Sequence, residues 1–112
     1  MQRVGEFGLV ALGGFVGATA RYAAALAVPG AAGTLAVNVV GSFLLGALTT
    51  TAPPRRLGLF VGAGALSSFT TYSTFAVETV SLGPLAGAAN VGATYALGVA
   101  AALAGIAVGG RL

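Results

Sequence analysis

The chain has 112 residues, of which 57% are hydrophobic and only 6% are charged. A typical soluble domain carries about a quarter charged residues, so this composition excludes an ordinary soluble protein and indicates that the lipid bilayer is the solvent. Cysteine and histidine are absent, and no acid/base pair or activated nucleophile can be assembled, so no enzyme is expected. Five arginines against two glutamates are too few for nucleic-acid binding.

Turn-forming residues divide the chain into four apolar segments. Proline and glycine cluster at residues 29–30, 53–54 and 83–84. The remaining segments cover residues 7–28, 33–51, 57–81 and 85–108, each close to the roughly 20 residues that cross a hydrocarbon core. The sequence therefore predicts one all-α domain, residues 1–112, with four transmembrane helices in the cell membrane.

Small residues follow one face of each of the first two segments. In the first segment Gly13 and Gly17 are one helical turn apart, and Arg21 follows after another turn. In the second segment small and polar residues repeat every four positions: Thr34, Asn38, Ser42 and Gly46. Such stripes let helix backbones approach closely and let polar side chains bond across the contact, so close helix packing is expected.

The third segment carries a dense polar cluster, SSFTTYSTFAVE at residues 67–78, inside an apolar span. As a helix, this cluster places hydroxyls and a carboxylate on one face: Ser67, Thr71, Thr74 and Glu78. Phe69, Tyr72 and Phe75 form a second, aromatic stripe. Polar side chains cost free energy in hydrocarbon unless protein or water satisfies them, so the cluster indicates a buried contact or a conduction path.

The same segment has the lowest tolerance for a continuous helix. Gly62 and Gly64 precede the adjacent pair Ser67 and Ser68, and the weak point between Ser67 and Thr70 falls near the bilayer midplane. A break there would free carbonyl oxygens for a hard cation and N–H groups for an anion. An unbroken helix whose hydroxyls bond back to their own carbonyls explains the same residues equally well.

The arginines are distributed unevenly between the two sides of the predicted bundle. One side would hold both termini, the middle loop and four arginines: Arg3, Arg55, Arg56 and Arg111. The loops around Pro29 and Pro84 carry no charge, so the positive-inside rule places both termini in the cytoplasm. Arg21 alone leans toward the far side.

Three motifs in chain order resemble those of the CrcB, or Fluc, family of fluoride channels. GALSSFTTYSTFAVE at residues 64–78 is similar to the family's signature, GGFVGATARY at 13–22 to its first-helix motif, and GTLAVNVVGSFLLG at 33–46 to its second. The resemblance covers the whole chain. It implies a fluoride-specific channel that passively exports cytoplasmic fluoride, built as an antiparallel dimer around one structural sodium ion.

The resemblance also implies roles for individual residues. The sodium ion would be held by the main-chain carbonyls of Ser67 and Thr70, and Arg21 would lie toward a vestibule. The fluoride pathway would comprise Asn38, Thr71, Tyr72, Ser73, Thr74, Phe75, Glu78, Asn90 and Thr94. Hydroxyl and amide donors and the positive edges of aromatic rings would replace the water around fluoride.

The chain departs from the family pattern at two places. Ser67 and Ser68 stand where the family usually has a glycine pair, and Tyr72 stands where it has the first phenylalanine. A carbonyl ligand tolerates serine, but a backbone with positive φ would not suit it. Sodium binding and turnover therefore depend on the local backbone and on the position of the added tyrosine hydroxyl.

Three alternatives stay open at this point. Small multidrug transporters have a similar length and four helices, but they carry a glutamate within the first helix, whereas Glu6 lies at the helix mouth. A structural protein without transport explains the small-residue stripes but not the polar and aromatic ones. Within the channel interpretation, four arginines against none favour one orientation, so the chain would pair with an oppositely oriented paralogue rather than with itself.

Overall fold

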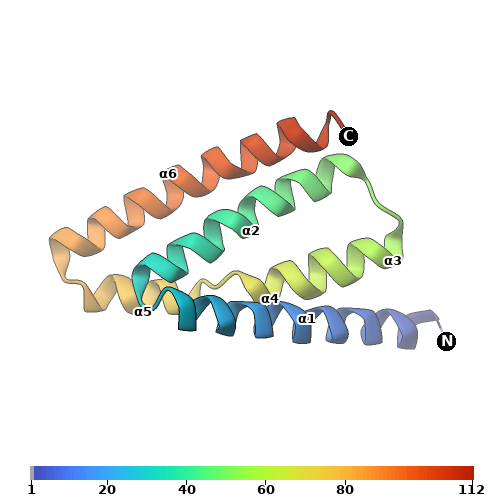
Figure 1. Cartoon of the computed structure of the whole chain (residues 1–112), viewed down its shortest axis with the longest axis horizontal. Coiled ribbons are helices and arrows are strands. Elements are labelled where there is room, and N and C mark those ends of the chain that lie inside the picture. Colours follow the sequence, from blue (N-terminus) through green and yellow to red (C-terminus); the bar gives the residue numbers. More distant parts are fainter. Residues whose placement is uncertain (1) are drawn as a thin grey trace.

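Four antiparallel helical passes make up the computed structural model, which describes residues 2–112 (Figure 1). The passes comprise α1 (Gln2–Ala27), α2 (Ala31–Thr51), a third pass in four pieces, and α6 (Pro84–Gly109). The pieces of the third pass are α3 (Arg55–Gly58), η1 (Leu59–Leu66), α4 (Ser67–Phe69) and α5 (Ser73–Ser81). The predicted all-α arrangement with a broken third helix is confirmed, although α1 begins at Gln2 rather than near residue 7. Met1 of the predicted domain lies outside the described residues.

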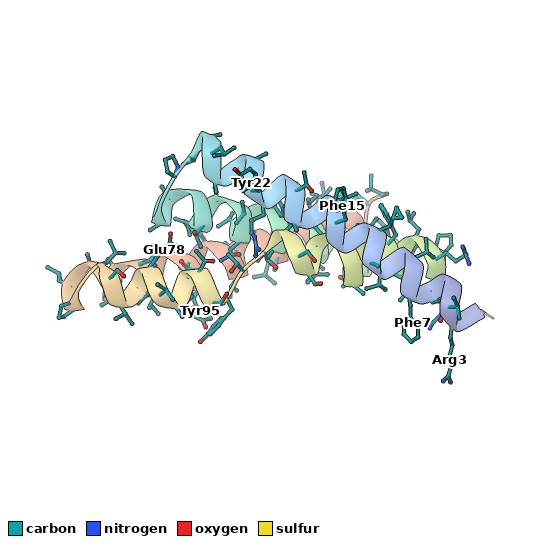
Figure 2. The ribbon with its side chains drawn as sticks, turned by 90° about the horizontal axis from the view of Figure 1, so that it is seen from below. Arg3, Phe7, Phe15, Tyr22, Glu78 and Tyr95 are labelled. Carbon is teal, nitrogen blue, oxygen red and sulfur yellow. The ribbon has the colours of Figure 1, made fainter. Side chains whose placement is uncertain are left out.

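The outside of the bundle is apolar. The helices α1, α2 and α6 are each long and apolar enough to cross a bilayer, and the chain is a multi-pass membrane protein. Large apolar side chains point outward, among them Phe7 and Phe15, which are 72% and 73% exposed (Figure 2). Among the described residues the buried hydrophobic side chains are Val37, Leu66 and Phe75. Lipid and any partner subunit must therefore cover most of the surface.

The passes associate as two pairs. The helix α2 packs along α6, and α1 packs along η1 and α4. Both termini and the α2–α3 connection lie at one end of the bundle, whereas the α1–α2 and α5–α6 connections lie at the other end (Figure 1). At the first end the Arg55 guanidinium binds the Glu6 carboxylate, with Nε 2.7 Å from Oε2. This ion pair joins the start of the third pass to the start of α1.

Glycine permits tight connections at the far end. Gly30 and Gly83 precede α2 and α6 with φ angles of 81° and 87°, in the left-handed region that side chains rarely adopt. Pro84 then lies in the first turn of α6, where its missing N–H removes no helical hydrogen bond. The turn signals at 29–30 and 83–84 are therefore confirmed.

Glycines also bring the backbones of α1 and η1 into direct contact. A Cβ atom on Gly13 would overlap the Phe60 carbonyl oxygen, and one on Gly17 would overlap the Ala65 carbonyl oxygen. The segment η1 is a π-helix, whose turns are wider than those of an α-helix, and it lies against this glycine stripe. The close packing predicted for the first segment is confirmed.

We expect Gly17→Ala to destabilise the bundle because the added methyl group would force α1 and η1 apart. Overpacking of this kind costs about 1–3 kcal/mol, which thermal unfolding of the purified protein in detergent measures as a lower midpoint. Gly8→Ala in the same helix is the matched control, since a Cβ atom on Gly8 meets nothing within 4 Å. Equal midpoints for the two variants would contradict the close contact.

The third pass loses its helical backbone at Thr70, where φ is −80° and ψ is 160°. The alternative of an unbroken helix is therefore wrong. Ser67 and Ser68 are still helical in α4, so the interruption comes just after the serine pair that the sequence indicated. Ser67 has a φ of −67°, and no residue of the described break has a positive φ. Serine in place of glycine therefore causes no backbone strain here.

Candidate functional site

Asn38 on α2 provides hydrogen bonds to the open backbone at Thr71. Its amide Nδ2 donates to the Thr71 carbonyl oxygen at 2.9 Å, and its Oδ1 accepts from the Thr71 N–H at 2.8 Å. Thr71 is 8% exposed, so these backbone groups need a partner within the protein. A Cβ atom on Gly41 would overlap the Thr70 side chain, because α2 approaches the break closely. Asn38 thus stabilises the interrupted helix from a neighbouring pass.

The Ser67 and Thr70 carbonyl oxygens are among those that the break leaves without helical donors. In a continuous helix the N–H of Thr71 would bond the Ser67 carbonyl, and the N–H of Thr74 would bond the Thr70 carbonyl. Instead, these two N–H groups donate to Asn38 Oδ1 and, at 3.2 Å, to Thr71 Oγ1. Main-chain carbonyls released in this way are suitable ligands for a hard cation. The donor chemistry of Ser67 and Thr70 therefore fits the sodium ion that the resemblance implies.

A groove of about 550 Å³ lies beside the break, between α2, the third pass and α6. The predicted site residues that line it are Asn38, Ser67, Thr70, Thr71, Tyr72, Phe75 and Thr94. Thr94 Oγ1 is buried and has no hydrogen-bond partner among the described residues. The groove therefore combines hydroxyl groups with aromatic rings, the two kinds of side chain that form the stripes of the third segment.

Three aromatic rings form a connected cluster in this groove. Phe75 is 6% exposed, and its ring centroid lies 5.9 Å from that of Tyr72 and 6.2 Å from that of Tyr95. The contact between Phe75 and Tyr95 is edge-to-face, with an interplanar angle of 79°. Tyr72 is 73% exposed, so its ring lies at the open side of the groove rather than inside the protomer.

Tyr95 is a groove residue that the sequence reasoning missed. It lines the groove next to Thr94 and contacts Phe75, which belongs to a different pass. The sequence offered one signal, since Tyr95 is the only aromatic residue of the fourth segment, 85–108. Spacing within one segment does not reveal a contact between two helices. Tyr95 therefore becomes apparent only once α5 and α6 are placed side by side.

A second cavity of about 240 Å³ lies between α1, α2 and α5. Four of the predicted site residues line it: Arg21, Thr71, Thr74 and Glu78. Glu78 Oε1 is buried without a partner among the described residues, and Arg21 Nη1 lies 3.5 Å from the Thr70 carbonyl oxygen. Figure 2 shows the Glu78 and Tyr95 side chains on opposite sides of α5. Thr71 lines both the groove and the cavity and therefore marks the boundary between them.

Two predicted pathway residues line neither the groove nor this cavity. Ser73 is exposed at the start of α5. Asn90 Nδ2 donates to Thr79 Oγ1 at 3.0 Å and so joins α6 to α5. The structure thus places the other predicted residues on the groove or the cavity, and these two on neither.

The fold and the site together define a small membrane protein of four passes. Its broken third helix lies between the groove and the cavity, both of which are partly polar. A family model described as CrcB-like protein, camphor resistance (CrcB), matches residues 8–106. This match covers most of the chain, and the chain belongs to the CrcB family. The resemblance carried by the three sequence motifs is thereby confirmed.

Similar proteins carry a consistent name. Fluoride-specific ion channel FluC 2 of Halobacterium salinarum is 52% identical over 106 residues, covering 89% of this chain and 83% of that protein. FluC 1 of Natronomonas pharaonis is 51% identical over 102 residues, covering 85% and 86% of the two chains. FluC 1 of Rhodococcus jostii is 46% identical over 104 residues, covering 92% and 84%. Because these relatives are named as ion channels, the expectation that the chain is not an enzyme is confirmed.

Proposed function

We propose that this chain forms a fluoride-specific ion channel that passively exports cytoplasmic fluoride. The observation that carries the proposal is that Thr71, beside the interruption of the third pass, lines both the groove and the cavity. The names of the relatives supply the ion. Export needs no energy source, because HF crosses the bilayer as a neutral molecule, ionises inside and is trapped as the anion. A passive path for the anion therefore drains the excess.

The residues around the break provide hydrogen-bond donors that can replace the water around fluoride. Fluoride is small and tightly hydrated, so a pathway has to replace its water shell with hydrogen-bond donors. Thr94 has a buried hydroxyl without a partner, and Asn38 has one amide hydrogen left after donating to Thr71. The edge of the Phe75 ring carries positive partial charge and can complete the shell. These groups support a fluoride path along the groove.

The proposed channel holds one structural sodium ion at the break. Ser67 and Thr70 would provide the main-chain carbonyl ligands, because the N–H groups that would pair with them donate to side chains. The Ser67 hydroxyl donates back to the Ala63 carbonyl, so the hydrogen that serine adds has a partner within its own pass. When bound, the ion supplies positive charge that offsets the charge of a nearby anion.

The working unit of the proposed channel is an antiparallel dimer in the cell membrane. Tyr72 and Tyr95 are 73% and 56% exposed beside the groove, although both belong to passes that cross the bilayer. A second subunit placed over this face would cover the two rings and close the open side of the groove. If the chain has one fixed orientation, its arginine-rich end, with both termini, would face the cytoplasm.

A heterodimer is the second candidate, and the placement of arginine favours it. Four arginines belong to the end of the bundle that holds both termini and the α2–α3 connection: Arg3, Arg55, Arg56 and Arg111. The two connections at the other end carry no charged residue. Such a bias fixes one orientation in the membrane. An antiparallel dimer then requires a related chain with the opposite orientation.

The alternative of a small multidrug transporter finds no support at Glu6. A proton-coupled exchanger of that kind needs a free carboxylate within its first membrane helix. Glu6 instead forms an ion pair with Arg55 near the start of α1. The carboxylate is therefore engaged in joining two passes.

Expression of this chain alone in a fluoride-sensitive bacterial strain separates the two dimer candidates. A homodimeric channel is expected to restore growth in fluoride fully. A chain that needs an oppositely oriented partner is expected to give no rescue alone and full rescue when the partner is expressed with it. Drug resistance without any change in fluoride sensitivity would contradict the channel proposal itself.

A further inference from the structure

Arg21 contacts the same carbonyl oxygen that the proposed sodium ion would use. Its Nη1 lies 3.5 Å from the Thr70 carbonyl oxygen, its one hydrogen bond to the described residues. This oxygen has no helical donor, because the Thr74 N–H donates to Thr71 Oγ1. A guanidinium and a sodium ion are both cations that bind carbonyl oxygens, and they repel each other at short distance. A sodium ion bound at this oxygen would therefore lie close to the Arg21 guanidinium.

The Glu78 carboxylate is a second acceptor for Arg21, in the cavity between α1, α2 and α5. Arg21 and Glu78 both line the cavity of about 240 Å³, and Glu78 Oε1 is buried without a partner among the described residues. The ion pair found in the described part of the chain joins Arg55 to Glu6, so Arg21 and Glu78 are not paired in this arrangement. A guanidinium binds a carboxylate more strongly than a neutral carbonyl. Arg21 thus has two alternative partners, one at the break and one on α5.

We propose that Arg21 is a tethered competitor of sodium at the Thr70 carbonyl, and that sodium binding moves its guanidinium toward Glu78. The inference rests on the proposed sodium site. A cation bound at Thr70 repels the guanidinium, while the shared cavity and the flexible side chain leave room for the move. Sodium occupancy thereby sets where the positive charge of Arg21 lies in the cavity. Anion attraction by Arg21 and sodium binding are therefore linked.

The sodium affinity of the purified protein measures this competition. Thermal unfolding in detergent is followed while NaCl replaces choline chloride at constant ionic strength, and the midpoint gives an apparent dissociation constant. Arg21→Gln removes the competitor, and we expect an affinity about five- to tenfold higher. Arg21→Lys keeps the positive charge but lacks the planar guanidinium. Its sodium affinity is expected to lie between those of the unaltered chain and of Arg21→Gln. Arg3→Gln makes the same charge change near the start of α1, and the affinity is expected to stay unchanged.

A double-mutant cycle tests the part played by Glu78. Glu78→Gln weakens the alternative acceptor, so Arg21 stays at Thr70 and the sodium affinity falls. In the Arg21→Gln background most of that loss is expected to disappear, because no competitor is left. An equal loss in both backgrounds would show that Glu78 acts on sodium directly and would overturn the proposed move.

One result of the sodium titration would contradict the proposed competition between Arg21 and sodium. An unchanged or lower sodium affinity for Arg21→Gln, in protein that remains dimeric in size-exclusion chromatography, would overturn it. If Arg21→Gln does not fold, Arg21→Lys decides in the same way, since its affinity must exceed that of the unaltered chain. If no variant responds to sodium while the reconstituted chain still conducts fluoride, the sodium site and this inference both fail and the channel proposal stands.

Discussion

Asn38→Ala is expected to abolish fluoride efflux and to weaken the folded bundle. The Asn38 amide satisfies both the N–H and the carbonyl oxygen of Thr71, which is buried. Without it these two groups lose their partners, at a cost of about 1–3 kcal/mol for each group. The Thr71 N–H could avoid this cost only by bonding the Ser67 carbonyl, which would close the helix across the break. One proposed sodium ligand and the open path at Thr71 would be lost together.

The measurement for Asn38→Ala is fluoride efflux from liposomes at matched protein content. If the interrupted backbone is destabilised by about 2 kcal/mol or more, efflux is expected to fall about 30-fold or more. Thr49→Ala is the control in the same helix, because the Thr49 hydroxyl bonds only to the Gly46 carbonyl and lies outside both the groove and the cavity. Its efflux is expected to match the unaltered chain. Efflux of Asn38→Ala at that same level would show that the break does not depend on this amide.

Phe75→Ile is expected to abolish efflux while the dimer persists. Phe75 is buried between Tyr72 and Tyr95, and its ring supplies edges with positive partial charge in the groove. Isoleucine keeps much of the apolar volume but has no such edge, so the anion loses part of its substitute water shell. Size-exclusion chromatography reports the dimer, and a fluoride electrode reports efflux from liposomes.

Phe15→Ile is the matched control for this prediction. Phe15 is 73% exposed on α1 and lines neither the groove nor the cavity, so the same exchange of side chains there is expected to leave efflux unchanged. Unchanged efflux of Phe75→Ile would remove the aromatic role. Loss of the dimer would instead assign Phe75 to packing.

Much of the fold could be predicted because its signals are local. The turn at Gly83 and Pro84 separates two apolar runs, and the stripe of Gly13 and Gly17 indicates a close helix contact. The site of the break was less accessible. Ser67 and Ser68 lower helix tolerance but stay helical, and Thr70 is the residue that adopts an extended backbone. A change of a few residues is decided by contacts with other passes, which a single segment does not contain.

The candidate site could likewise be predicted only where its signals lie within one segment. The polar face of the third segment predicted where the important residues lie, and most of them line the groove or the cavity. The sequence did not show that Asn38 pairs with Thr71, because these residues lie on different passes. The contact of Tyr95 with Phe75 was hidden for the same reason. Asn90 also matched the family pattern, yet in the protomer its amide bonds Thr79.

Fluoride release from liposomes that contain the purified chain tests the central proposal most directly. A fluoride electrode follows the external ion after a potassium ionophore is added to vesicles loaded with potassium fluoride. We predict rapid release of fluoride and no release of chloride from matched vesicles loaded with potassium chloride. No fluoride release from vesicles that hold folded, dimeric protein, or equal release of chloride, would contradict the assignment as a fluoride-specific channel.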